Sequence, residues 1–249
     1  MGWKRRRIFP PTASPFTKVF ETAATQPYLA RVSDGFTDST LGRQRQLPPF
    51  TIALIALNVA AFLLETWIDA RTAFPLEKYG ALSLRGLRQG YFWQLLSFQF
   101  LHAGWIHLLL NCWGIFVFGP PLEATLGKMR LAAIYFLSGV AGGALQVFAS
   151  MLSYARFGGP VVGASAGVFG LVAAFTSLFP DARMTLLLFF VIPLRMTANR
   201  MLTVAAIITA VGIMFPNRLL GAHVAHAAHL GGLIAGLVFV RAFMGRFRP

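Results

Sequence analysis

Long apolar runs constrain the fold of this chain more than any other feature of its sequence. FTIALIALNVAAFLLETWI, from Phe50, and LAAIYFLSGVAGGALQVFASML, from Leu131, each approach the length that crosses a bilayer as an α-helix, which is about 20 residues. Charged residues make up 12% of the chain, whereas soluble domains carry about 25%. Lipid admits only helices and closed barrels, because no water satisfies a free backbone. The sequence therefore predicts an all-α polytopic membrane protein.

Six segments are predicted to form transmembrane helices. They run over residues 50–68, about 102–118, 131–152, 165–179, about 201–215 and about 222–243. The second is expected to end at Pro120-Pro121, because proline interrupts helices. MTLLLFFVIPL, from Met184, is too short to cross and contains Pro193. The mixed aromatic and charged stretch 69–94 is expected to lie at the membrane interface.

The distribution of positive charge predicts the orientation of this six-helix bundle. An even number of crossings puts both termini on one side, and cytoplasmic loops carry more Lys and Arg. With both termini inside, few of the 22 Lys and Arg residues fall outside: Arg71, Lys78, Arg85, Arg88, Arg156 and Arg218. We therefore predict an N-in, C-in domain over residues 50–243. Residues 1–49 are expected to form a weakly ordered basic tail in the cytoplasm, and residues 244–249 a short basic C-terminal tail.

Charge and cysteine content limit the partners and cofactors of the chain. The net charge is +14, but the basic residues gather at the ends of apolar runs, which indicates the lipid bilayer rather than nucleic acid as a partner. Cys112 is the only cysteine, so neither an intrachain disulfide nor a cysteine-based metal site is possible. His223, His226 and His229 follow at three-residue steps with no acidic residue nearby. We expect no metal and no cofactor.

Four polar side chains fall at a similar depth in three of the predicted helices. His107 and Asn111 are four residues apart in the second helix, so they project from one face. Ser165 opens the fourth helix, and His229 comes about 10 Å into the sixth at 1.5 Å per residue. Because lipid cannot satisfy polar groups, such residues are candidates for a functional site.

A serine becomes a nucleophile when a histidine accepts its proton, and Ser165 and His229 are the candidate pair. Their helices must nearly touch, which small residues allow. Such residues flank both positions: Gly163, Gly167, Gly232 and Gly236. No acidic residue is predicted at this depth, so the sequence favours a dyad over a triad. His226, one turn before His229, remains an alternative base.

Acyl transfer also requires hydrogen-bond donors for the oxyanion. The His107 ring, the Asn111 amide and the backbone N–H of Ser165, at the start of a helix, are the candidate donors. Each group also has a purely structural interpretation. Ser165 could cap its helix, and the other polar side chains could join helices by hydrogen bonds.

Three motifs, in order, resemble those of the rhomboid family of intramembrane serine proteases. They are FLHAGWIHLLLN at 100–111, GASAGVFG at 163–170 and AHLGGLIAG at 228–236. The resemblance implies a Ser165–His229 dyad, with an oxyanion hole formed by His107, Asn111 and the Ser165 backbone. It implies that Phe169 packs against the catalytic histidine. It also implies substrates that are single-pass membrane proteins, cut near the outer edge of their helix. We expect the bacterial cell (inner) membrane as the location.

The chain departs from the family pattern in three places. Glu123 is followed by Ala124-Thr125-Leu126-Gly127, without the arginine that some members place there. Gln94 stands where the family commonly has arginine, which we expect to loosen the first loop. Ala166 follows Ser165, and the glycine comes one residue later, at Gly167. None of these departures removes a catalytic group. An alternative function is that of a catalytically silent rhomboid-like protein that binds transmembrane helices, but such relatives usually lack the serine or the histidine and this chain has both. A small-solute transporter is less favoured, because no internal repeat is evident.

Overall fold

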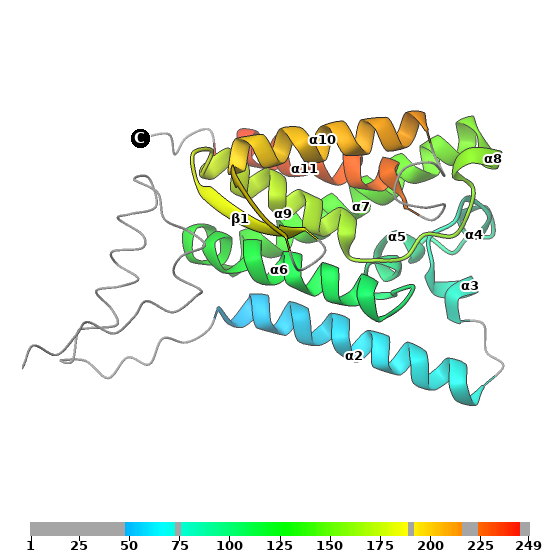
Figure 1. Cartoon of the computed structure of the whole chain (residues 1–249). Coiled ribbons are helices and arrows are strands. Elements are labelled where there is room, and N and C mark those ends of the chain that lie inside the picture. Colours follow the sequence, from blue (N-terminus) through cyan, green and yellow to red (C-terminus); the bar gives the residue numbers. More distant parts are fainter. Residues whose placement is uncertain (1–47, 73–75, 189–191, 216–223, 245–249) are drawn as a thin grey trace, which may run out of the picture.

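The computed structural model describes residues 48–72, 76–188, 192–215 and 224–244, and this part of the chain is mostly helical. Six of its helices have 14 or more residues: α2 (Pro49–Arg71), α6 (Trp105–Leu126), α7 (Lys128–Leu152), α9 (Ser165–Leu178), α10 (Ala198–Met214) and α11 (His226–Met244). Figure 1 shows these helices as one bundle, with α2 along one edge beside α6. The helices α7, α9 and α11 contact one another most extensively and form its centre.

Four helices in the described residues are long and apolar enough to cross a membrane. These spans are Pro49–Arg71, Trp105–Leu126, Lys128–Leu152 and His226–Phe243. The helices α9, with 14 residues, and α10, with 17, are apolar but shorter. The described chain is therefore a bundle of apolar helices, as the composition predicted. The predicted tails lie almost wholly outside the described residues.

Two antiparallel strands depart from the all-α expectation. β1 (Arg183–Leu188) pairs with β2 (Ile192–Thr197). The register pairs Arg183 with Thr197 and Leu188 with Ile192. This segment is rich in Leu, Phe, Val and Ile, which suit a pleated surface, and Pro193 disfavours a helix through it. Met184 is 2% exposed and packs into the core, so the hairpin is attached to the bundle. The expectation of an exclusively helical chain is wrong at this connection.

A second difference concerns α6, which was expected to end at Pro120-Pro121 but continues to Leu126. The two prolines remove two backbone donors, yet the turn beyond them is buried, with Leu122 at 0% exposed and Leu126 at 5%. Tertiary packing of this turn outweighs the local preference of proline, as it commonly does in proteins.

Glu123, in that last turn of α6, holds the beginning of α2. Its Oε1 accepts a hydrogen bond from the Phe50 backbone N–H at 2.9 Å. Its Oε2 accepts from the Thr51 N–H at 2.8 Å and from the Thr51 hydroxyl at 2.7 Å. The first N–H groups of a helix have no partner within it, and a carboxylate there also meets the positive end of the helix dipole. A residue for which the sequence indicated no role thus joins two helices.

The connection between α2 and α6 contains the short helices α3 (Leu76–Gly80), α4 (Leu84–Arg88), α5 (Gln94–Ser97) and η2 (Phe98–Phe100). The Gln94 side chain is completely buried within it. Its Nε2 donates to the carbonyls of Lys78 at 3.1 Å and Tyr79 at 3.3 Å, and its Oε1 accepts from the Ser83 N–H at 3.2 Å. The expectation that Gln94 loosens this loop is therefore wrong, because a neutral amide supplies both the donors and the acceptor that the backbone requires.

The connection between α7 and α9 is fastened at two places. It contains α8 (Tyr154–Phe157), whose Phe157 carbonyl accepts hydrogen bonds from Ser150 Oγ at 2.7 Å and Gln146 Nε2 at 3.2 Å. Arg156 donates to the carbonyl of Met214, the last residue of α10, at 2.8 Å. The segment that leads to Ser165 is thereby attached to both α7 and α10.

Replacing Glu123 with alanine is expected to destabilise the protein by about 3 kcal/mol, because three donors at the start of α2, two of them in buried hydrogen bonds, lose their acceptor. Thermal unfolding in detergent micelles measures the effect. Asp181→Ala is the matched control, since Asp181 is an exposed acid between α9 and β1. Equal unfolding temperatures for the two variants would contradict the role given to Glu123.

Candidate active site

Ser165 and His229 lie in contact between α9 and α11. Ser165 is the first residue of α9, and its Oγ is 2.8 Å from Nε2 of His229, in the first turns of α11. Gly163, two residues earlier, has a φ of 122°, a backbone conformation that residues other than glycine rarely adopt. The left-handed turn at Gly163 thus directs the chain into α9 with Ser165 at its start.

Glycines on α11 bring the two helices this close. A Cβ on Gly232 would collide with the carbonyl oxygen of Ala166 in α9. One turn later, a Cβ on Gly236 would lie 2.9 Å from Cα of Gly170. The backbones therefore touch over two turns, and His229, three residues before Gly232, faces α9 beside Ser165.

The two remaining glycines of the predicted set have other neighbours. Gly163 lies against the His107 ring, where a Cβ would be 2.6 Å from Cε1. Gly167 faces Tyr135 of α7, whose Cδ2 would be 2.8 Å from a Cβ at that position. The expectation that both glycines serve the contact between α9 and α11 is therefore wrong. Instead, the missing side chain at Gly163 lets His107 of α6 pack close to Ser165, and the missing side chain at Gly167 does the same for Tyr135 of α7.

Aromatic contacts hold the His229 ring. Phe169, one turn after Ser165, stacks on it with ring centroids 4.3 Å apart and planes at 6°. His226 lies edge-on to His229 at 6.2 Å, and its ring packs against Gly212 of α10. The structure thus brings His229, and not His226, within hydrogen-bond reach of Ser165. His223 lies outside the described residues.

His107 and Asn111 lie on the face of α6 that meets Gly163. Asn111 Nδ2 donates one N–H to the His107 carbonyl at 3.0 Å, so the second N–H of this amide can donate elsewhere. The Ala103 N–H donates to His107 Nδ1 at 3.4 Å. Because Nδ1 accepts, the neutral ring carries its proton on Nε2, the atom that faces Gly163. The side chains of both residues therefore have a donor available near the start of α9.

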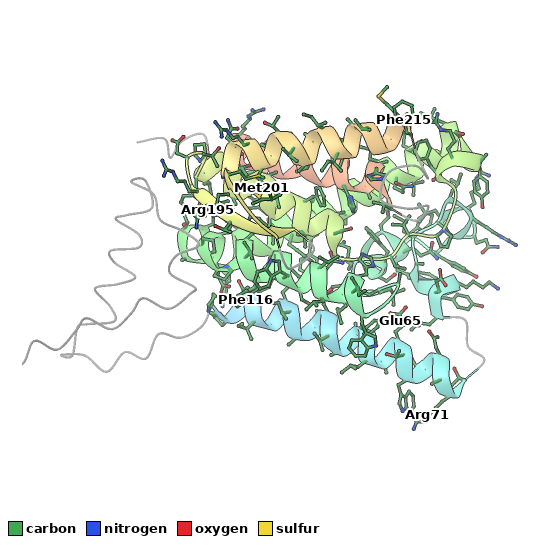
Figure 2. The ribbon with its side chains drawn as sticks, viewed as in Figure 1. Glu65, Arg71, Phe116, Arg195, Met201 and Phe215 are labelled. Carbon is green, nitrogen blue, oxygen red and sulfur yellow. The ribbon has the colours of Figure 1, made fainter. Side chains whose placement is uncertain are left out.

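The ring beside His107 belongs to His102, at the mouth of the second predicted helix, to which the sequence assigned no definite role. The His102 ring is 3% exposed and lies edge-on to His107 at 5.3 Å. Its backbone N–H donates to Oε2 of Glu65 at 3.1 Å. Figure 2 labels Glu65. Burial, together with the nearby His107, lowers the pKa of His102 to about 4. An acidic residue inside the first apolar run was the signal that could have found Glu65.

No metal-binding cluster accompanies these residues in the part of the chain that the structure describes. No group of three or more His, Cys, Asp or Glu side chains there could hold a metal ion. Cys112 carries a free thiol.

The fold and the site together define a helical membrane protein with a serine and a histidine in contact between two of its helices. Residues 89–246 match the family model described as the rhomboid domain, so the chain belongs to the rhomboid family of intramembrane proteases.

Individual relatives support this assignment. The chain is 34% identical to the putative rhomboid protease YdcA of Bacillus subtilis over 131 residues, 51% of this chain and 59% of the relative. It is 37% identical to RHOMBOID-like protein 2 of Arabidopsis thaliana over 192 residues, 75% and 53% of the two chains. It is 33% identical to inactive RHOMBOID-like protein 8 of the same plant over 108 residues, 43% and 29%. The chain spans about half the length of the curated relatives it matches.

Gly232→Ala is expected to destabilise the protein by about 1–3 kcal/mol, because the new methyl group overpacks the contact with Ala166. Gly159→Ala is the matched control, since no atom lies within 4 Å of a Cβ at Gly159. Thermal unfolding of both variants is the measurement. A Gly232→Ala protein as stable as the control would show that the backbones of α9 and α11 are not in contact there.

The His102 pKa predicts a pH dependence of stability. His102 binds its proton near pH 6.5 in the unfolded chain and at about 4 in the folded protein. Its contribution is complete above pH 6.5 and is lost as the pH falls from 6.5 towards 4. Between pH 7 and pH 5, His102→Asn should therefore lose roughly 2 kcal/mol less stability than the wild type. Unfolding temperatures at the two pH values test this, and identical losses would contradict it.

Proposed function

We propose that the chain is an intramembrane serine endopeptidase that cleaves single-pass membrane proteins near the outer edge of their transmembrane helix. The observation that carries the proposal is the 2.8 Å contact between Ser165 Oγ and His229 Nε2. Members of the rhomboid family, to which the chain belongs, are generally serine proteases. The catalytic pair in this proposal is Ser165 and His229.

In the proposed reaction, His229 Nε2 accepts the Ser165 proton while Oγ attacks the carbonyl carbon of a substrate peptide bond. The protonated His229 then donates to the leaving amine, and the C–N bond breaks. Water, deprotonated by the same ring, hydrolyses the ester and regenerates Ser165. The stacked Phe169 supports this cycle, because it limits the orientations of the His229 ring. Within the described residues no carboxylate is hydrogen-bonded to His229, which favours a dyad.

Three donors are proposed to stabilise the oxyanion. The first is the Ser165 N–H, which at the start of α9 has no acceptor within its own helix. The other two are Nε2–H of His107 and the second N–H of Asn111. Their contact with Gly163, two residues before Ser165, supports a shared target. Fixed donors of this kind act on the charge that develops in the transition state.

The proposed topology is a six-helix domain over residues 50–243 with both termini in the cytoplasm. Four helices long enough to cross, together with the shorter α9 and α10, support this number. The basic tails at 1–49 and 244–249 support the orientation. We propose the bacterial cell (inner) membrane as the location; one relative is from Bacillus subtilis, whereas others are plant and mitochondrial proteins.

A second candidate is a catalytically silent protein that binds transmembrane helices. One relative is named an inactive rhomboid-like protein, so family membership alone does not decide the activity. The presence of both Ser165 and His229, in contact, favours the protease.

The decisive experiment is cleavage of a reporter single-pass protein by the purified chain in liposomes. Ser165→Ala and His229→Ala are each expected to lower the rate about 1,000-fold or more. Ser177→Ala, at an exposed serine of the same helix, is the matched control and should cleave normally.

The outcomes separate the alternatives. Cleavage by His229→Ala but not by His226→Ala would make His226 the base. Equal cleavage by the wild type and Ser165→Ala would exclude Ser165 as the nucleophile. A wild type that binds the reporter helix without cutting it would establish the silent binder.

A further inference from the structure

The hairpin formed by β1 and β2 has a polar face that the candidate active site does not use. Arg183 pairs with Thr197, and Thr185 with Arg195, so these four side chains lie on one face of the ribbon. Met184, between them in β1, lies on the opposite face and is 2% exposed in the core. The arginine-bearing face of the hairpin is therefore turned away from the bundle.

The two arginines are close together and carry uncompensated charge. Arg183 and Arg195 are diagonal neighbours across the two strands, an arrangement in which the residues are about 7–8 Å apart and their Cβ atoms somewhat closer. Both side chains are exposed, and in the described part of the chain neither is paired with a carboxylate. The exposed acid nearest in sequence, Asp181, forms no ion pair with them there. Both guanidinium groups are thus available to one anion.

Other cations lie at the same end of the bundle. Arg200, in the first turn of α10, is exposed, and its N–H donates to Thr197 Oγ1 at 3.4 Å, which fixes it beside the hairpin. Lys128, the first residue of α7, is also exposed. Figure 2 shows Arg195 at this end of the bundle, where α10 begins.

We propose that the hairpin face formed by Arg183, Thr185 and Arg195 binds the phosphate of an anionic membrane lipid. Arginine matches phosphate oxygens with two parallel hydrogen bonds, and a threonine hydroxyl adds a third donor. The ligand class is a glycerophospholipid with net negative charge, such as phosphatidylglycerol. The site is separate from Ser165 and does not depend on the proposed protease activity.

The surface next to the arginines identifies a lipid rather than a free anion. One turn after Arg200, α10 begins an exposed apolar face with Val204, Ile207 and Ile208. A phosphate at the hairpin would leave the acyl chains of its lipid along this face. A soluble phosphate would make no contact with this apolar face. Cationic side chains at the ends of apolar helices, in contrast, attract anionic lipids.

The experiment measures lipid binding by the full chain in zwitterionic nanodiscs into which phosphatidylglycerol is titrated, with bound lipid counted by native mass spectrometry. The double variant Arg183→Gln/Arg195→Gln should bind phosphatidylglycerol about 25-fold more weakly, because each cation contributes about fivefold. The matched control is Arg85→Gln/Arg88→Gln, which removes two exposed arginines from α4. The control should bind as the wild type does.

A second variant guards against a folding defect. Arg183→Lys/Arg195→Lys keeps both charges but loses the paired hydrogen bonds, so it should bind with intermediate affinity. Three results would overturn the proposal: wild-type affinity in the double Gln variant, an equal loss in the control, or no preference for phosphatidylglycerol over phosphatidylcholine. Displacement of the lipid by inorganic phosphate would assign the site to a free anion instead.

Discussion

The direct contact between the backbones of α9 and α11 is the constraint on which the rest of the structure depends. Inside a membrane, apolar side chains gain little by leaving lipid, so helices associate where small residues let their backbones approach. Gly232 and Gly236 meet Ala166 and Gly170 in this way. On its other side α11 meets α7, where a Cβ on Gly231 would lie 2.8 Å from Cα of Gly142. The contact between Ser165 and His229 is a consequence of this three-helix packing.

The few strongly polar side chains of this apolar chain connect elements that are distant in sequence. Glu123 joins the end of α6 to the start of α2, and Gln94 joins the segments of the first connection. Arg156 reaches the last carbonyls of α10. Each bonds backbone groups that helix ends and loops leave free, and lipid cannot satisfy such groups. These polar side chains therefore lie where helices end, and they bond the backbone groups that the helices leave unpaired.

Counting along the chain predicted some features well, because depth along a helix is residue number multiplied by a fixed rise. The similar depth expected for Ser165 and His229 follows from such reasoning, and Pro180 indicated where α9 ends. Counting does not predict how a helix is rotated about its axis or which helix packs against it. Gly167 faces Tyr135 of α7 rather than α11 because three helices converge there. The continuation of α6 beyond Pro121 was missed because packing overrode local propensity. The hairpin was missed although its residues suit strands, because the strand pairing joins residues on either side of a turn.

The length of α9 has a geometric consequence of its own. Its 14 residues extend about 21 Å, whereas the hydrocarbon core of a bilayer is about 30 Å thick. A helix of this length cannot reach both surfaces, and its far end is joined to the hairpin whose basic face suits one surface. With the hairpin at one surface, as the proposed lipid site requires, Ser165 would lie about 9 Å short of the other surface. A short helix of this kind would bring the serine within reach of water through a step in the bundle rather than through a pore.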